Sequence, residues 1–206
     1  QVSAVKVQFE RLSELEKRKE TILASIDEQG KLTPELRMKI EQCYEGAPLE
    51  DLYLPYRPKR RTRATVAREK GLEPLAAMLM RQDGARPDRL AERFVGGEVH
   101  DLQEALDGAC DIIAEWVSES EAARSAMRRL FTREGVISAR VVKGKEQEGA
   151  KYSDYFDWSE PLRRVAAHRL LAMVRAEREG FIKLSVLPDE SAAVEQLERI
   201  FIKRNP

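Results

Sequence analysis

The sequence has few of the residues that build metal centres or disulfide frameworks. It contains two cysteines and two histidines among 206 residues. Cys43 and Cys110 lie far apart in apolar helical patterns, which favours two buried thiols in a reducing compartment over a disulfide. None of the four residues has the short spacing of a metal site. We therefore expect a protein that binds no metal and needs no cofactor.

The sequence also lacks long hydrophobic runs. No apolar stretch approaches the roughly 20 residues that a membrane helix needs. No signal-peptide pattern opens the chain, because apolar and polar residues already alternate from Val2 to Phe9. We expect a cytoplasmic protein that has no membrane partner.

Signatures of catalysis are missing as well. There is no GxSxG, P-loop or dinucleotide-binding glycine pattern. His168 shares a helical face with Leu171 and Ala172, which is more typical of a hydrogen-bonded core histidine than of a catalyst. His100 is placed to cap a helix. We expect no catalytic residue, and hence a protein that is not an enzyme.

Charge and helical periodicity are abundant. Charged residues make up 35% of the chain and aromatic residues only 6%. Apolar residues recur three or four positions apart from Val5 to Gln29, and Gly30 ends this predicted helix. Thr33-Pro34-Glu35 predicts the start of a second helix, which would form a hairpin with the first. Helix patterns continue along most of the chain, at 48–54, 65–71, from 73 onwards, and at 88–94, 101–117, 121–133, 161–179 and 189–203.

Two segments are less clear. The β-branched residues of 136–144 favour a strand, but this segment continues directly from a helix and lacks strict alternation, so we expect a helix. Phe181–Leu187 alternates with period two between Gly180 and Pro188, and is the one good strand candidate. The predicted fold class is all-α, an elongated multi-helix array of helical hairpins with at most a short strand near 181–187.

The same patterns suggest a domain organisation. We expect an N-terminal helical hairpin at 1–46, a central helical region at 47–180 that includes a basic loop at 55–64, and a strand and helix at 181–206. A lone strand needs a partner, and the chain begins with Gln1. We therefore expect a piece of a longer protein, whose last segment leads into a missing downstream domain.

The basic loop is the most informative feature. From Arg57 to Lys70 the chain has seven basic residues and one acid, a local charge of +6 in a chain of net charge zero. Pro55 and Pro58 predict an irregular loop for its first half. Two interpretations remain open: the arginines neutralise phosphates, with Tyr56 stacking on a base, or they fix the loop to acidic side chains and helix C-termini.

Specific motifs resemble the Tex family, the bacterial transcription accessory proteins related to a eukaryotic transcription elongation factor. The resemblance is carried by Asp51-Leu-Tyr-Leu-Pro-Tyr-Arg-Pro-Lys-Arg-Arg-Thr-Arg-Ala64, the segments 67–75 and 142–156, and His168-Arg-Leu-Leu-Ala-Met173. It implies the helical N-terminal region of a multidomain protein. In such proteins an RNase-H-like domain, helix-hairpin-helix elements and an RNA- or DNA-binding OB-fold lie further along.

The resemblance and the basic loop together suggest a function. We expect support of sequence-independent RNA or DNA binding in transcription, through Tyr56, Arg57, Lys59, Arg60, Arg61 and Arg63. The alternative is a protein-interaction scaffold that docks downstream domains or the transcription machinery without touching nucleic acid. This scaffold hypothesis predicts arginines that are partly buried against carboxylates.

Overall fold

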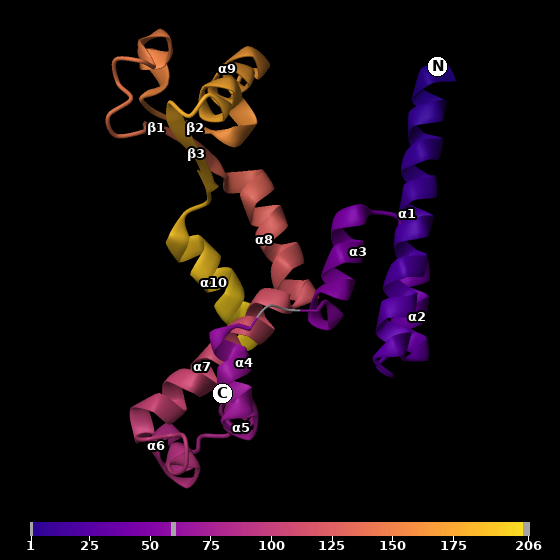
Figure 1. Cartoon of the computed structure of the whole chain (residues 1–206), viewed down its shortest axis with the longest axis vertical. Coiled ribbons are helices and arrows are strands. Elements are labelled where there is room, and N and C mark those ends of the chain that lie inside the picture. The colour runs from indigo at the N-terminus through magenta and orange to yellow at the C-terminus, as the bar shows by residue number, and fades with distance from the viewer. Residues whose placement is uncertain (1, 59–60, 204–206) are drawn as a thin grey trace. The chain divides into compact units, whose positions relative to one another are not determined.

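The computed structural model describes residues 2–58 and 61–203 of the chain (Figure 1). The chain divides into two compact units, Gln1–Arg124 and Ser125–Arg204. Within the described residues no helix is both long enough and apolar enough to cross a membrane. The predicted boundaries near 46 and 180 stay predictions.

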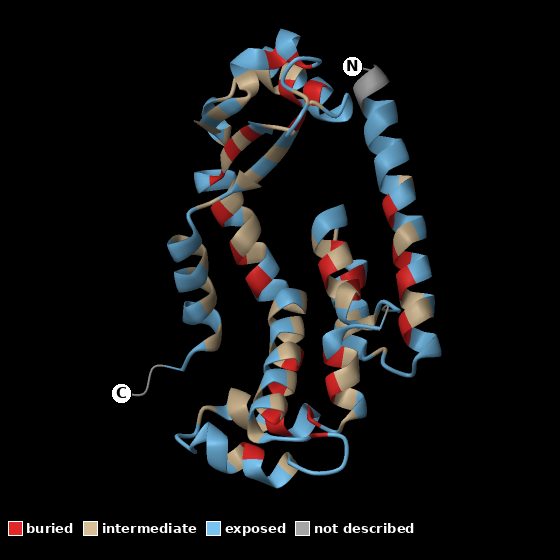
Figure 2. Ribbon diagram, turned by 60° about the vertical axis from the view of Figure 1, so that its left-hand side comes forward, coloured by how far each residue is buried: buried red, intermediate tan, exposed pale blue. Residues whose placement is uncertain are grey.

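The first unit begins with a small helical cluster. Helix α1 (Val2–Glu28) packs against α2 (Pro34–Glu41) and α3 (Gly46–Tyr53), which leads into the 3-10 turn η1 (Leu54–Tyr56). The predicted start of α2 is confirmed, since the Thr33 side chain accepts a hydrogen bond from the Leu36 N–H. The buried residues of this cluster are Leu15, Ile22, Ile26, Ile40, Leu49 and Tyr53. Figure 2 shows that, among the described side chains of α1, the buried ones lie from the middle of the helix to its C-terminal end.

A second helical cluster completes this unit. It comprises α4 (Arg63–Glu69), α5 (Glu73–Arg81), α6 (Pro87–Ala91), η2 (Glu92–Phe94) and α7 (Leu102–Glu119). Small residues let α4 and α7 pack closely, because Ala64 and Ala67 on α4 meet a face of α7 that carries Ala105 and Gly108. A Cβ at position 108 would overlap the Leu72 side chain. The next helix, α8 (Glu121–Glu134), spans the boundary between the two units.

The second unit contains an antiparallel sheet. Its strands are β1 (Val136–Val141), β2 (Asp157–Pro161) and β3 (Ile182–Leu187), in the order β2-β1-β3. Helix α9 (Ala167–Arg178) packs against the sheet together with η3 (Ala150–Tyr155). The turn η4 (Leu162–Arg164) follows β2, and α10 (Glu190–Phe201) follows β3. The core is formed by Ile137, Ala139, Tyr152, Met173, Ala176 and Ile182.

The predicted all-α class is therefore wrong. The strand predicted near 181–187 is confirmed as β3, but the segment predicted as a helix after residue 135 is β1, the central strand. Gly135 allows the change of direction, because a Cβ there would collide with the Phe131 carbonyl of α8. Burial then alternates along β1, with Ile137 and Ala139 facing the core. The β2 strand was not predicted, since 157–161 reads as polar sequence before a helix.

Two further expectations about single residues are corrected. Both cysteines are free, but Cys110 is exposed and Cys43 is only partly buried, so neither is a core thiol. His168 is exposed on α9 rather than buried in the core. Cys43 follows the end of α2 and packs at the margin of the α1–α3 cluster, whereas Cys110 on α7 and His168 on α9 are open to solvent.

Candidate nucleic-acid interface

The basic loop leaves the α1–α3 cluster from a fixed point. Tyr53 is buried and its hydroxyl lies 3.1 Å from the Ser25 hydroxyl. The Gln29 side-chain amide donates a 2.8 Å hydrogen bond to the Tyr56 carbonyl. The Tyr56 ring is half-buried against the same cluster, so it contributes to packing as well as to the surface.

Arg57 is exposed and follows this fixed point. Its charge adds to the field at Glu50, whose pKa lies below its usual value. The main cause is Arg18, which donates hydrogen bonds of 2.6 and 2.9 Å to the two Glu50 oxygens. The predicted contacts Lys59 and Arg60 lie outside the described residues.

The loop returns to regular structure at a well-formed helix cap. The Thr62 hydroxyl accepts a 3.1 Å hydrogen bond from the Thr65 N–H, and the Thr65 hydroxyl accepts one of 3.3 Å from the Thr62 N–H. Thr62 also donates to Glu115 of α7 at 3.1 Å. This reciprocal capping satisfies two free N–H groups of the first turn and holds the end of the loop against α7.

Arg61 and Arg63 flank this cap and remain open to solvent. Arg61 pairs with Glu69 at 2.8 Å, and its side chain is 70% exposed. Arg63 lies 3.7 Å from Asp111, and its side chain is 90% exposed. Pairs this exposed are screened by water and contribute little to stability. Both guanidinium groups are therefore accessible to a ligand.

The later basic residues of the run are structural. Arg68 donates a 2.7 Å hydrogen bond to Glu115, lies 3.5 Å from Glu73, and is only 28% exposed. Lys70 forms an ion pair with Glu104. This lysine is the main cause of a lowered pKa at Glu104, and the backbone N–H of His100 adds to the effect through a 2.8 Å hydrogen bond. The run thus contains exposed arginines as well as basic residues that are anchored to carboxylates.

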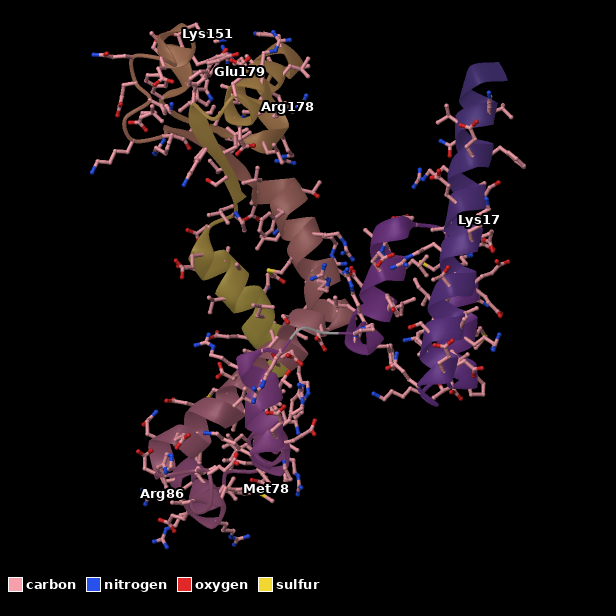
Figure 3. The ribbon with its side chains drawn as sticks, viewed as in Figure 1. Lys17, Met78, Arg86, Lys151, Arg178 and Glu179 are labelled. Carbon is pink, nitrogen blue, oxygen red and sulfur yellow. The ribbon has the colours of Figure 1, made fainter. Side chains whose placement is uncertain are left out.

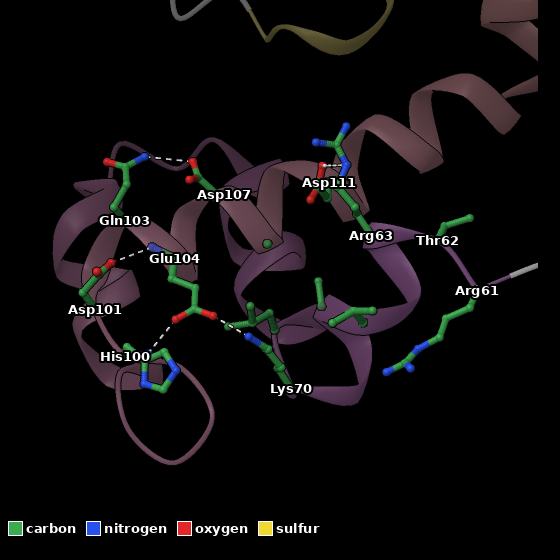
Figure 4. Close-up of a pocket in the computed structure, with 14 residues that line it drawn as sticks. Arg61, Thr62, Arg63, Lys70, His100, Asp101, Gln103, Glu104, Asp107 and Asp111 are labelled. Atoms are coloured by element: carbon green, nitrogen blue, oxygen red, sulfur yellow. Dashed lines mark hydrogen bonds and ion pairs between the residues drawn. The ribbon is translucent and has the colours of Figure 1, made fainter.

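An open groove of about 850 Å³ lies between the end of the loop, α4 and α7 (Figure 4). Its floor includes Ala67, Leu72 and Gly108. The charges along it are mixed, since three basic side chains face four carboxylates: Arg61, Arg63 and Lys70 opposite Asp101, Glu104, Asp107 and Asp111. Such a groove does not suit a polyanion along its length. The accessible positive charge lies at the end formed by Arg61 and Arg63.

The acidic partners on α7 were not predicted from the sequence. Glu104, Asp111 and Glu115 recur at intervals of seven and four residues, which places them on one side of the helix. That spacing indicates a helix with one acidic side, which can face a basic neighbour. The cap of α7 is Asp101, whose carboxylate accepts from the Glu104 N–H at 2.8 Å, rather than His100. Among the described residues, no group of three or more His, Cys, Asp or Glu side chains is arranged to hold a metal ion.

Comparison with known proteins identifies the family of this chain. Residues 82–205 match the family described as Tex central region-like. The chain belongs to this family, which confirms the resemblance carried by the basic loop and the later motifs. The part of the family that matches is its central region, whereas the motifs suggested the N-terminal region.

Individual relatives agree with this assignment. The chain is 42% identical over 189 residues to the transcriptional accessory protein Tex of Neisseria gonorrhoeae. It is 44% identical over 191 residues to protein YhgF of Escherichia coli K12, and 44% identical over 167 residues to protein tex of Bordetella pertussis. These matches cover 80–92% of this chain and 21–25% of the relatives. The chain therefore spans about a quarter of the length of the relatives it matches.

Proposed function

We propose that this chain is a non-enzymatic part of a transcription accessory protein and that its basic loop contacts the phosphate backbone of RNA or DNA. The observation that carries the proposal is the high exposure of the Arg61 and Arg63 guanidinium groups on either side of a rigid helix cap. Arginine donors in a fixed position suit phosphate oxygens, and contacts of this kind carry no sequence information.

A binding titration tests this role of the loop. Fluorescence anisotropy of a labelled 20-nucleotide RNA would be measured at low salt against the wild type and Arg61→Ala/Arg63→Ala. The expected result is an affinity about tenfold lower, with a salt slope reduced by about 1.4, or 0.7 for each lost contact to a single strand. Equal affinities for the two proteins would contradict the role of the loop.

The matched control removes two arginines elsewhere in the same unit. Arg86 and Arg89 are exposed, and Arg86 pairs with Asp88 at 3.6 Å with 74% exposure, much as Arg61 pairs with Glu69 (Figure 3). Arg86→Ala/Arg89→Ala changes the net charge by the same amount. If this variant loses as much affinity as the loop variant, the binding depends on total charge and not on the loop.

A second candidate function is a protein-interaction scaffold. The N-terminal part of α1 exposes Val5, Phe9 and Leu12, whose spacing continues the apolar stripe that α2 and α3 cover further along the helix. A stripe of this kind suits an apolar partner surface. Phe9→Glu/Leu12→Glu would then abolish association with the remaining domains of a relative, measured by sedimentation velocity, and leave RNA binding unchanged.

A further inference from the structure

The outer side of α9, in the second unit, combines exposed apolar and basic residues. The opposite side of this helix is its core side, where Met173 and Ala176 are fully buried. At 100° per residue, four exposed residues share an arc of about 100° on the outer side: Leu171, Val174, Arg175 and Arg178. We call these four residues the α9 face. They offer an apolar contact and two cations on one surface.

The two cations of the α9 face are available to a ligand. The pKa of Glu179 is lowered mainly by its pairing with Lys151 at 2.7 Å, and Arg175 adds to this effect from beyond ion-pair distance. Arg178 enters no ion pair with a described residue. A carboxylate from outside can therefore approach both guanidinium groups without displacing an ion-pair partner.

The apolar residues of the face decide which class of ligand fits it. A phosphate backbone would engage the two guanidinium groups and leave Leu171, which is 70% exposed, in water. Single exposed apolar residues are ordinary on protein surfaces, but Leu171 and Val174 are neighbours on one turn of the helix. A partner that covers both and carries carboxylates at its margin engages the whole face. The face therefore suits an acidic amphipathic helix better than a nucleic acid.

Helix α10 of the same unit has this character. None of the described residues of α10 is buried, and α10 contributes to none of the three core clusters (Figure 2). Val194, Leu197 and Ile200 recur at intervals of three residues, and Val194 is 47% exposed. On a helix of 100° per residue, the exposed Glu198 and Glu195 follow on one margin of this apolar stripe. The stripe and its acidic margin complement the α9 face.

The linker before α10 is too short for α10 to reach the α9 face of its own chain. Docking there would place α9 between the sheet and α10, so the α10 axis would lie about 15–18 Å from the sheet, one helix diameter plus one radius. Since β3 ends at Leu187 and α10 begins at Glu190, only two residues bridge this gap. Three Cα–Cα steps span at most about 11 Å. The matching α9 face must therefore belong to another copy of the chain.

We propose that the chain self-associates by docking α10 of one copy onto the α9 face of a second copy. The apolar residues of the two helices pack together, and the two arginines pair with the two glutamates at the margin. Because the two surfaces differ, each contact leaves one surface of each copy unused, and copies add head to tail. A contact between two helices is small, so the association is weak and depends on concentration. It does not depend on nucleic-acid binding by the basic loop.

Two charge reversals test the contact. The α9 variant is Arg175→Glu/Arg178→Glu, and the α10 variant is Glu195→Lys/Glu198→Lys. Sedimentation velocity of the full chain is measured up to about 1 mM, the range of weak contacts. We expect the wild-type weight-average mass to rise with concentration, and each variant alone to associate at least about tenfold more weakly. An equimolar mixture of the two variants should associate again, because each α10 then meets an α9 face of opposite charge.

Two controls and one further variant separate the contact from other effects of the substitutions. Arg86→Glu/Arg89→Glu makes the same change of charge at exposed residues of the other unit, and should associate like the wild type. Leu171→Ser removes an apolar contact without a change of charge, and should also weaken association. Circular dichroism at low concentration checks that each variant keeps its helices. All the substituted residues are exposed, so we expect unchanged spectra.

Several outcomes would overturn the inference. It fails if the wild type is monomeric at every concentration, or if the α9 variant associates as well as the wild type. A mixture of the α9 and α10 variants that stays monomeric also contradicts it. Loss of association in Phe9→Glu/Leu12→Glu, with the α9 variant unaffected, would assign the contact to α1. Weaker RNA binding by the α9 variant, with unchanged self-association, would assign the α9 face to a nucleic acid instead.

Discussion

Asp51 is almost completely buried and accepts a hydrogen bond from the Nε of Arg124, so the carboxylate of α3 is paired with an arginine at the start of α8. Both residues belong to the first unit. Asp51 begins the motif that carried the family resemblance, and its neighbours Leu49 and Tyr53 are core residues of the α1–α3 cluster. The motif therefore has a structural role before the basic loop begins.

Removing the arginine should destabilise the first unit. Arg124→Ala removes an ion-pair partner of a buried carboxylate, and losses of this kind are about 3–5 kcal/mol for fully buried pairs. The Arg124 side chain is 43% exposed, so we expect about 2 kcal/mol. Urea denaturation followed by circular dichroism measures the free energy of unfolding.

A double variant identifies the cause of this loss. In the Arg124→Ala background, Asp51→Asn replaces the buried charge with a neutral amide of similar shape. We expect it to restore part of the lost stability, because a neutral amide is far less costly to bury than an ion. If the double variant is as unstable as the sum of the two single variants, the pair does not interact energetically.

Close packing of α4 on α7 gives a second prediction. A methyl group at position 108 would overlap Leu72, which is 1% exposed, and would lie 3.3 Å from the Ala67 Cβ. We expect Gly108→Ala to lower the free energy of unfolding by about 1 kcal/mol, since overpacking, typically 1–3 kcal/mol, outweighs the helix propensity of alanine. Gly46→Ala in α3 meets no atom within 4 Å, and should be neutral or stabilising. Equal changes in the free energy of unfolding at positions 46 and 108 would show that the overlap with Leu72 does not destabilise the fold.

The helices were predictable from sequence because their signals are local. Thr33-Pro34-Glu35 marks the start of α2, and apolar spacing marks α1 and α7. The sheet was not predictable to the same degree, because a strand is stabilised by partners far away in the chain. Residue 137 pairs with Glu160 on one side and Val186 on the other, and neither is visible in a local pattern.

The candidate site also combines features that the local sequence predicts with features that depend on distant contacts. Charge density alone located the basic loop. Proline chemistry predicted an irregular segment before α4, and the described residues 57–58 and 61–62 have no regular structure, although Tyr56 ends the turn η1. Which arginines are exposed depends on α7, where Asp111 meets Arg63 and Glu115 meets Arg68, 47 residues further along the chain in the second pair. Contacts between distant segments therefore decide which arginines of the loop are accessible.

The pair between Arg18 and Glu50 predicts a dependence on pH. Arg18 lowers the pKa of Glu50, so this carboxylate stabilises the fold above its unfolded pKa of about 4.3 and ceases to do so as the pH falls through the lower folded value. The side chains are 40% and 45% exposed, which limits the effect to about 0.5–1 kcal/mol. Urea denaturation should show the wild type more stable than Glu50→Gln at pH 7, with the difference vanishing near pH 2. A difference that persists at low pH would assign the effect to packing instead of charge.

Two serines that face each other test the position of β1 in the sheet. Ser138 of β1 is paired with Ser159 of β2, and their hydroxyl oxygens are 3.1 Å apart. The Val142 N–H bonds to Phe181 of the β3 side, and the Val141 N–H bonds to Phe156 of the β2 side. Since antiparallel pairs alternate, the Ser138 N–H points to β3, and the Ser159 N–H points away from β1 at the edge of the sheet.

Proline at these two positions should therefore have unequal effects. Ser138→Pro removes a ladder hydrogen bond from the central strand, and we expect a loss of about 3 kcal/mol or more. Ser159→Pro breaks the same contact between the two hydroxyls but no ladder bond, and we expect a loss of less than about 1 kcal/mol, because edge strands tolerate proline where the N–H faces solvent. Chemical denaturation of the two variants, each compared with its alanine counterpart, gives the difference. Equal losses would contradict the order β2-β1-β3, in which β1 is the only one of these three strands with a partner on each side.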